Sequence, residues 1–245
     1  MTQGLRTRSI VLIGLCVAFT VLFAALGAWQ VQRRAWKLDL IARVEQRLQA
    51  APVPPPEPAQ WAGLTREGDA YRRVRLVGVY DHQREVLTQA VTELGPGFWV
   101  MTPLRAEQGF TVLVNRGFVP IARKTPDTRI AGQAPGPVTV VGLLRLSEPG
   151  GGFLRANRPD EGRWYSRDVQ AIGRTQGITT LAPYFVDADA TSNPGGWPRG
   201  GLTVVRFPNS HLIYALTWFG LALLTGGAAV YVVADARRTH RKEDE

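Results

Sequence analysis

The chain has 245 residues, of which 45% are hydrophobic, and its formal net charge is +9 from 29 Lys and Arg against 20 Asp and Glu. This length allows one or two domains. The single Cys excludes a disulfide framework and a zinc site built from several thiolates. With three His in all and no Ser-centred nucleophile motif, the sequence shows no catalytic constellation, so we expect a protein that is not an enzyme.

Two long uncharged segments set the class of the protein. Residues 10–29 (IVLIGLCVAFTVLFAALGAW) and 212–234 (LIYALTWFGLALLTGGAAVYVVA) are each long enough to cross a bilayer as a helix. A cleaved signal peptide is the alternative for the first segment, because Arg6 and Arg8 precede it. Its apolar stretch is longer than a signal peptide usually has and continues into a helical pattern. We therefore predict transmembrane helices at residues 10–29 and 211–234.

Two spans place both termini on the same side of a membrane. The short tails, residues 1–9 and 235–245, carry basic residues and are therefore predicted to be cytoplasmic. The long central region then lies outside the cytoplasm, which removes nucleic acid as a partner and leaves anionic lipid or an acidic protein. Only nine residues precede the first span, too few for a mitochondrial presequence. We expect a multi-pass protein of a bacterial inner membrane with a periplasmic central domain.

The hydrophobic period changes along the central region. Residues 30–51 continue the first helix with apolar residues three and four apart, and the prolines of residues 52–60 indicate a stiff linker. Residues 61–210 favour strands separated by Gly and Pro turns. We expect strands at 71–80, 86–91, 97–104, 111–119, 138–146, 184–187 and 202–207, and a helix at 168–176. The predicted fold class is a two-helix transmembrane hairpin with a sheet-rich α+β periplasmic domain inserted between the spans.

His211 is the sharpest candidate for a ligand. It stands at the outer end of the second span, where a neutral imidazole could coordinate iron. Tyr214 and Trp218 follow at i+3 and i+7, so they share its helix face and could rest against a flat macrocycle. The alternative is an interfacial His within an aromatic belt.

Basic and aromatic residues gather near the same predicted membrane surface. Trp29, Arg33 and Arg34 stand where the first span ends, and Arg206 stands just before the second. Guanidinium groups pair with carboxylates, so a haem held at His211 would turn its propionates toward this rim. A membrane anchor that only fixes the depth of the helices is the alternative.

Two polar motifs favour structural roles. Asn115-Arg116-Gly117 interrupts an expected strand and predicts a bulge or a sharp turn. Asp81-His82 follows a strand and is more typical of a polar turn than of acid–base chemistry.

Four stretches together resemble the Surfeit locus protein family of cytochrome c oxidase assembly factors. They are residues 27–41 (GAWQVQRRAWKLDLI), 71–82 (YRRVRLVGVYDH), 112–120 (VLVNRGFVP) and 203–222 (TVVRFPNSHLIYALTWFGLA). The resemblance covers nearly the whole chain and implies a role in maturing subunit I of the haem-copper oxidase. It also implies haem a as the carried cofactor, with His211 as the axial ligand of its iron.

From these residues and the resemblance together, we expect a chaperone that binds haem a and assists its insertion into subunit I. The expected partners are subunit I, haem a synthase and membrane lipid. A cofactor-free membrane scaffold that stabilises subunit I during assembly is the alternative.

Overall fold

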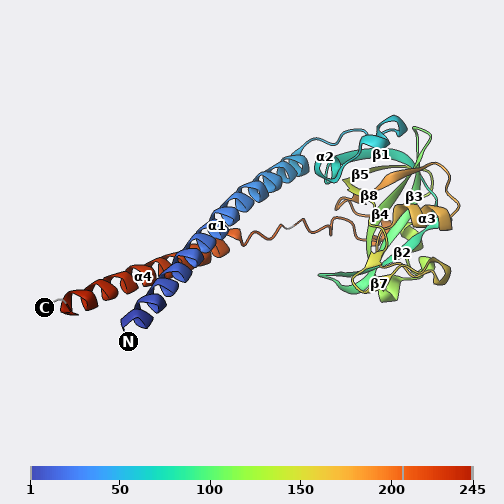
Figure 1. The fold of residues 1–245 in the computed structure, drawn as a ribbon. Coiled ribbons are helices and arrows are strands. Elements are labelled where there is room, and N and C mark those ends of the chain that lie inside the picture. The colour runs from blue at the N-terminus through green and yellow to red at the C-terminus, as the bar shows by residue number, and fades with distance from the viewer. Residues whose placement is uncertain (1, 206, 244–245) are drawn as a thin grey trace. The chain divides into compact units, whose positions relative to one another are not determined.

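In the computed structural model, residues 2–205 and 207–243 are described, and the chain divides into two compact units (Figure 1). The first unit comprises Met1–Arg43 and Arg206–Glu245 and holds two long helices. The second unit, Val44–Val205, contains the sheet. This division confirms the expected order of a long apolar helix, a sheet-rich domain and a second apolar helix.

The first and last helices are long and apolar. Helix α1 runs without a break from Thr2 to Gln49, and α4 runs from His211 to Glu243. Within them, Thr7–Gln49 and His211–Arg238 have the length and composition needed to cross a membrane. The apolar segment and its amphipathic extension are therefore one helix, as their shared period predicts.

Helices α1 and α4 pack directly against each other in antiparallel directions. The hydroxyl oxygens of Thr20 and Thr225 lie 2.9 Å apart and share a hydrogen bond. Further along α1, the ring of Phe23 stacks on Trp218 with 5.6 Å between centroids. Contact positions increase along α1 as their partners decrease along α4, so the helices are antiparallel. Each threonine hydroxyl also bonds to a backbone carbonyl of its own helix, and the hydroxyl pair adds a polar contact between the helices.

Small residues let the two backbones approach closely. Buried alanines recur along α4 at every seventh position, which is two helical turns: Ala215, Ala222 and Ala229. On α1, a Cβ added at Gly27 would lie 2.6 Å from the ring of Phe219, so a larger residue would displace that ring from the crossing. Such small-residue contacts are typical of helix pairs in membranes.

The sheet-rich unit is built on a closed five-stranded barrel. Its strands are β1 (Arg73–Tyr80), β2 (Val86–Thr92), β3 (Gly95–Ala106), β4 (Thr111–Pro120), β5 (Pro137–Leu146) and β8 (Leu181–Ala188), with a separate hairpin of β6 (Gly151–Gly152) and β7 (Arg155–Ala156). The order is β1-β5-β8-β4-β3-β2, and β1 also pairs with β3, which closes the barrel and leaves β2 as an added strand. All pairs are antiparallel except β4 with β8. Closure requires Gly78, where a Cβ would lie 2.2 Å from the carbonyl oxygen of Arg105.

Short helices connect these strands. They are α2 (Arg66–Asp69), α3 (Val169–Thr175) and the 3-10 turns η1 (Pro58–Gly63), η2 (His82–Arg84), η3 (Ile121–Arg123), η4 (Pro126–Gly132), η5 (Pro159–Glu161) and η6 (Pro194–Gly196). The Asp168 side chain caps α3 by accepting a hydrogen bond from the backbone N–H of Ala171. Helix α3 is the helix expected at residues 168–176.

Alternate side chains of the barrel strands enter two apolar clusters. One cluster contains Val74, Leu76, Leu104, Ala106, Phe110, Val112, Val114, Val140, Leu144, Ala182, Tyr184 and Val186. The other, which includes residues of α3, contains Val86, Met101, Leu113, Trp164, Val169, Ile172 and Phe185. Strand β4 contributes to both clusters, because Val112 and Val114 enter the first while Leu113 enters the second.

The proline segment is attached to the barrel. Val53 forms a parallel bridge with Val74 of β1, and its N–H donates to the carbonyl oxygen of Arg73 at 3.1 Å. The Pro56 carbonyl oxygen accepts hydrogen bonds from the Tyr184 hydroxyl at 2.9 Å and from the Trp61 indole at 3.0 Å. The segment therefore extends along the barrel wall as part of the domain.

One expected strand is wrong. Among residues 202–207, the described positions 202–205 and 207 have no regular secondary structure. Strand β3 pairs along β4, and β8 covers the other edge of β4 only from Thr111 to Asn115; the residues at 202–205 do not extend that edge. The approaching chain forms an isolated bridge between Arg199 and Phe118, and the Gly201 N–H donates to the Ala188 carbonyl oxygen at 3.1 Å. The six other expected strands are confirmed as β1, β2, β3, β4, β5 and β8.

Candidate functional site

His211, the first residue of α4, faces the partner helix. Its Nδ1 lies 2.7 Å from Oε1 of Gln30 on α1, and the side chain is half-buried. The two residues are 181 positions apart in the chain, so the antiparallel packing of α1 and α4 brings them together.

This contact favours one tautomer of the imidazole. With Gln30 Oε1 as the acceptor, His211 Nδ1 is the nitrogen that carries the proton. In a neutral imidazole, Nε2 then keeps its lone pair. A metal-binding His in proteins usually donates its other ring N–H in this way, which orients the ring and raises the basicity of the ligating nitrogen. In this arrangement Nε2 is the ring nitrogen with a free lone pair, which is the form of imidazole that can bind a metal.

The predicted basic residues lie on the same part of α1 as Gln30. Arg33 and Arg34 follow Gln30 by three and four positions, so they lie one turn further along the same side of α1. Both side chains are exposed. The guanidinium carbon of Arg33 lies 4.2 Å from the ring centroid of Trp36. Arg206 lies outside the described residues.

The predicted aromatic residues divide into two kinds. Tyr214 and Trp29 are 55% and 54% exposed, so their rings are available to a ligand. Trp218 is half-buried and stacks on Phe23 of α1, so it contributes to helix packing two turns along α4 from His211. The structure thus joins His211 to α1, leaves Tyr214 and Trp29 open, and engages Trp218 in packing.

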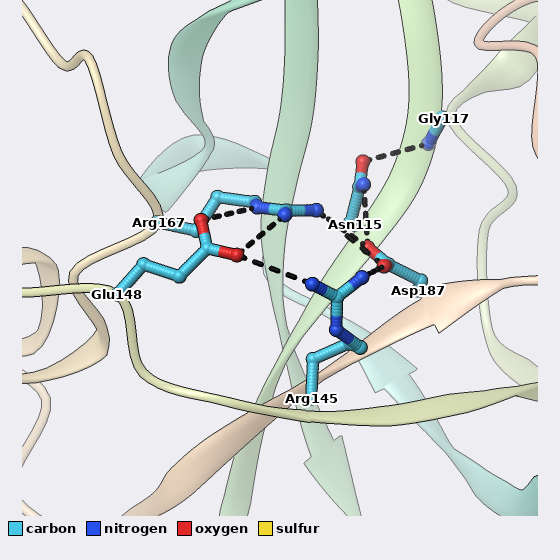
Figure 2. A network of polar contacts seen from close by, with 6 residues as sticks. All are labelled: Asn115, Gly117, Arg145, Glu148, Arg167 and Asp187. Atoms are coloured by element: carbon cyan, nitrogen blue, oxygen red, sulfur yellow. Dashed lines mark hydrogen bonds and ion pairs between the residues drawn. The ribbon is translucent and has the colours of Figure 1, made fainter. Parts of the chain in front are cut away.

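A buried polar network in the barrel wall has no counterpart in the sequence expectations (Figure 2). Asp187, which is 2% exposed, accepts hydrogen bonds from Asn115 at 2.7 Å, Arg145 at 2.9 Å and Arg167 at 3.0 Å. Glu148 binds the same two arginines. Burial alone would lower the pKa of Arg167, but the Asp187 and Glu148 carboxylates raise it above its ordinary value. The network joins β4, β5 and β8. Its two arginines are balanced by the carboxylates of Asp187 and Glu148, so the network has no unpaired positive charge to offer a ligand.

The bulge expected at Asn115–Gly117 is confirmed. Trp99 pairs with Phe118 while Met101 pairs with Asn115, so two residues of β4 oppose one residue of β3. Gly117 takes a φ of 131°, and its N–H donates to the Asn115 side-chain oxygen at 3.2 Å. The bulge turns Asn115 toward the network.

Arg116, in the same bulge, enters a second polar cluster. It is 1% exposed, its guanidinium carbon lies 4.8 Å from the centroid of Tyr80, and its Nη1 lies 3.5 Å from His82 Nδ1. Burial raises the pKa of Tyr80 to about 12 and lowers the pKa of His82 below its ordinary value. The expected polar turn at Asp81-His82 is thus part of a packed structural cluster.

The chain has a closed barrel domain between two apolar helices that are long enough to cross a membrane, and His211 of one helix contacts the other. These features are typical of membrane-anchored proteins with a folded domain outside the bilayer. The sequence model of the SURF1 family matches residues 17–223. Surfeit locus protein 1 of Homo sapiens is 40% identical over 218 residues, which cover 82% of this chain and 70% of the human protein. The Mus musculus protein is 41% identical over 217 residues (82% and 68%), and the SURF1-like protein of Monosiga brevicollis is 35% identical over 214 residues (82% and 79%). The chain belongs to the SURF1 family, which is known for cytochrome oxidase assembly factors.

Proposed function

We propose that the protein binds haem a and assists its insertion into subunit I during the assembly of haem-copper cytochrome c oxidase. Membership of the SURF1 family supports the role in assembly. The observation that supports haem binding is the contact between His211 Nδ1 and Gln30 Oε1, which leaves Nε2 as a donor for iron.

The residues around His211 fit the chemistry of haem a. Its ring and isoprenoid tail are apolar, and its propionates are carboxylates. Tyr214 and Trp29 offer exposed aromatic surface, while Arg33 and Arg34 offer guanidinium groups suited to carboxylates. The buried Oδ1 of Asn209, two positions before His211, finds no hydrogen-bond partner within the described residues and can accept one from a bound molecule.

Transfer follows from the weakness of a single protein ligand. His211 supplies one axial bond, so two His ligands of the receiving subunit would compete successfully for the same iron. Gln30 holds the imidazole ready in the loaded state, and the arginines hold the propionates near the surface. The chain thus shelters an apolar molecule from water without holding it irreversibly.

We further propose the location that this role needs. Helices α1 and α4 would span a bacterial inner membrane, with both termini cytoplasmic and the barrel domain periplasmic. Subunit I would receive the haem, haem a synthase would supply it, and lipid would surround the helices.

The test is the optical spectrum of the full chain, purified in detergent from a host that makes haem a. We expect a haem a Soret band at near-stoichiometric occupancy in the wild type, its loss in His211→Ala, and its retention in the control His240→Ala. A colourless wild type that still captures subunit I would favour the cofactor-free scaffold. Unchanged haem content in His211→Ala would remove His211 from the mechanism.

A further inference from the structure

A short hairpin presents two large apolar side chains to solvent. Strands β6 and β7 are joined by Phe153 and Leu154, which are 91% and 89% exposed. Leu154 also has a φ of 57°, in the left-handed region that bulky residues seldom adopt. Exposed apolar residues at a strained tip indicate that the tip contacts another apolar phase.

The base of this hairpin is held firmly. Oδ1 of Asn157 accepts hydrogen bonds from the backbone N–H groups of Tyr165 at 2.8 Å and Ser166 at 3.1 Å, and its Nδ2 donates to the Ser166 hydroxyl at 2.9 Å. Arg155 donates to the Gln89 side chain at 3.4 Å. The tip is therefore an ordered projection of the domain, which reduces the entropic cost of binding.

A cationic hollow adjoins the hairpin. It has a volume of about 290 Å³, and its lining includes Gln89 and Tyr165, which contact the hairpin base, together with Lys124 and Arg163. The Lys124 ammonium lies 5.2 Å from the centroid of Phe98. Arg163 pairs with Glu161 at 2.9 Å, and Arg158 pairs with the same carboxylate at 3.1 Å.

Lys124 and Arg155 differ from those paired cations. Neither forms an ion pair with any described residue, and each lies over an aromatic ring. Cations without a carboxylate partner can meet the phosphates of an anionic membrane while apolar side chains enter its interface.

We propose that the tip of the β6–β7 hairpin is a second membrane contact of this protein. Phe153 and Leu154 enter the bilayer interface, and Lys124 and Arg155 meet the phosphates of anionic lipids. The inference rests on the proposed placement of α1 and α4 in a bilayer.

Chain connectivity favours a lipid surface as the partner. The second unit ends at Val205 and α4 begins at His211, so these six steps reach at most about 20 Å when fully extended. If α4 starts at the membrane surface, Val205 stays within that reach of the bilayer. A tether of this length raises the effective concentration of the surface, so a small apolar tip suffices for contact.

The test measures the depth of the tip in the full chain, reconstituted in nanodiscs of phosphatidylcholine with or without phosphatidylglycerol. In a Cys16→Ser background, Phe153→Cys is labelled with an environment-sensitive fluorophore and quenched by lipid that is spin-labelled near its head group. We expect severalfold stronger quenching than at the control Arg66→Cys on α2, which lies at the opposite end of the domain from β7 (Figure 1). Phosphatidylglycerol should strengthen the quenching, and Lys124→Glu with Arg155→Glu should abolish that increase.

A second label separates this inference from the proposed function. Val21→Cys lies in the apolar stretch of α1 and should be quenched by lipid spin-labelled deep in its acyl chain. Quenching at Val21 without quenching at Phe153 would overturn the hairpin contact and leave the proposed function standing. No quenching at Val21 would overturn the placement of α1 in a bilayer. Equal quenching at Phe153 with and without phosphatidylglycerol would overturn the proposed contact of Lys124 and Arg155 with lipid.

Discussion

Replacing Gln30 by Leu tests how the helix pair prepares His211 for a metal. The change keeps the size of the side chain but removes the oxygen that lies 2.7 Å from His211 Nδ1. A neutral hydrogen bond of this kind contributes about 0.5–1.5 kcal/mol, which converts to about a 2- to 12-fold change in a dissociation constant. Loss of an outer partner of a metal-binding His weakens binding by about 10- to 100-fold, so we expect a loss of about tenfold.

The assay is a titration of the detergent-purified apoprotein with haem a, followed at the Soret band. Gln32→Leu is the matched control, because Gln32 is exposed on the same helix two positions away. Gln30→Glu keeps an acceptor oxygen and should bind at least as tightly as the wild type. Wild-type affinity in Gln30→Leu, together with lost affinity in His211→Ala, would refute the role of Gln30 in orienting the imidazole.

Three further predictions concern packing, charge and pH, each followed by thermal or denaturant unfolding of the full chain in detergent. Gly27→Ala forces a Cβ into the helix crossing and should destabilise the helix pair by about 1–3 kcal/mol, whereas Gly14→Ala, with nothing within 4 Å, should not. Asp187→Asn removes the buried carboxylate from two half-buried arginines, which then keep only Glu148, and should cost the domain about 1.5–3 kcal/mol, against about 0–1 kcal/mol for the exposed Glu161→Gln. Burial lowers the pKa of His82, so the unfolded chain binds a proton that the folded domain does not as pH falls below 6.5. Stability should therefore decrease below that pH, and His82→Gln should reduce the decrease; an unchanged slope would contradict this.

The sequence predicted the elements of this fold better than their pairing. Alternation located β1 and β4 because one or both of their faces are buried. Closure of the barrel was not predictable, because it depends on Gly78 meeting Arg105 from a strand remote in the chain. The strand expected at 202–207 is absent from its described residues, because tertiary contacts that alternation does not encode decide which segments pair with the sheet.

The candidate site was predictable only in part. His211 was identified because an ionisable residue at the end of an apolar helix is unusual. Gln30 was not identified although it lies within residues 27–41, which carry part of the family resemblance. The register of two helices that are apolar on all sides cannot be derived from their periodicity. The burial of Arg116 and Asp187 was not predicted, because such residues are ordinarily exposed and only their tertiary partners show that they are buried.

The strand order has a consequence for how the chain is made. Strand β8 is the last barrel strand in the sequence, yet it lies between β5 and β4. Until Leu181–Ala188 has left the ribosome, β4 and β5 expose unpaired edges to other chains. The barrel therefore completes only after β8, its last strand in the sequence, has been synthesised. Nascent chains that stall before this point are expected to be the ones that aggregate or meet proteases.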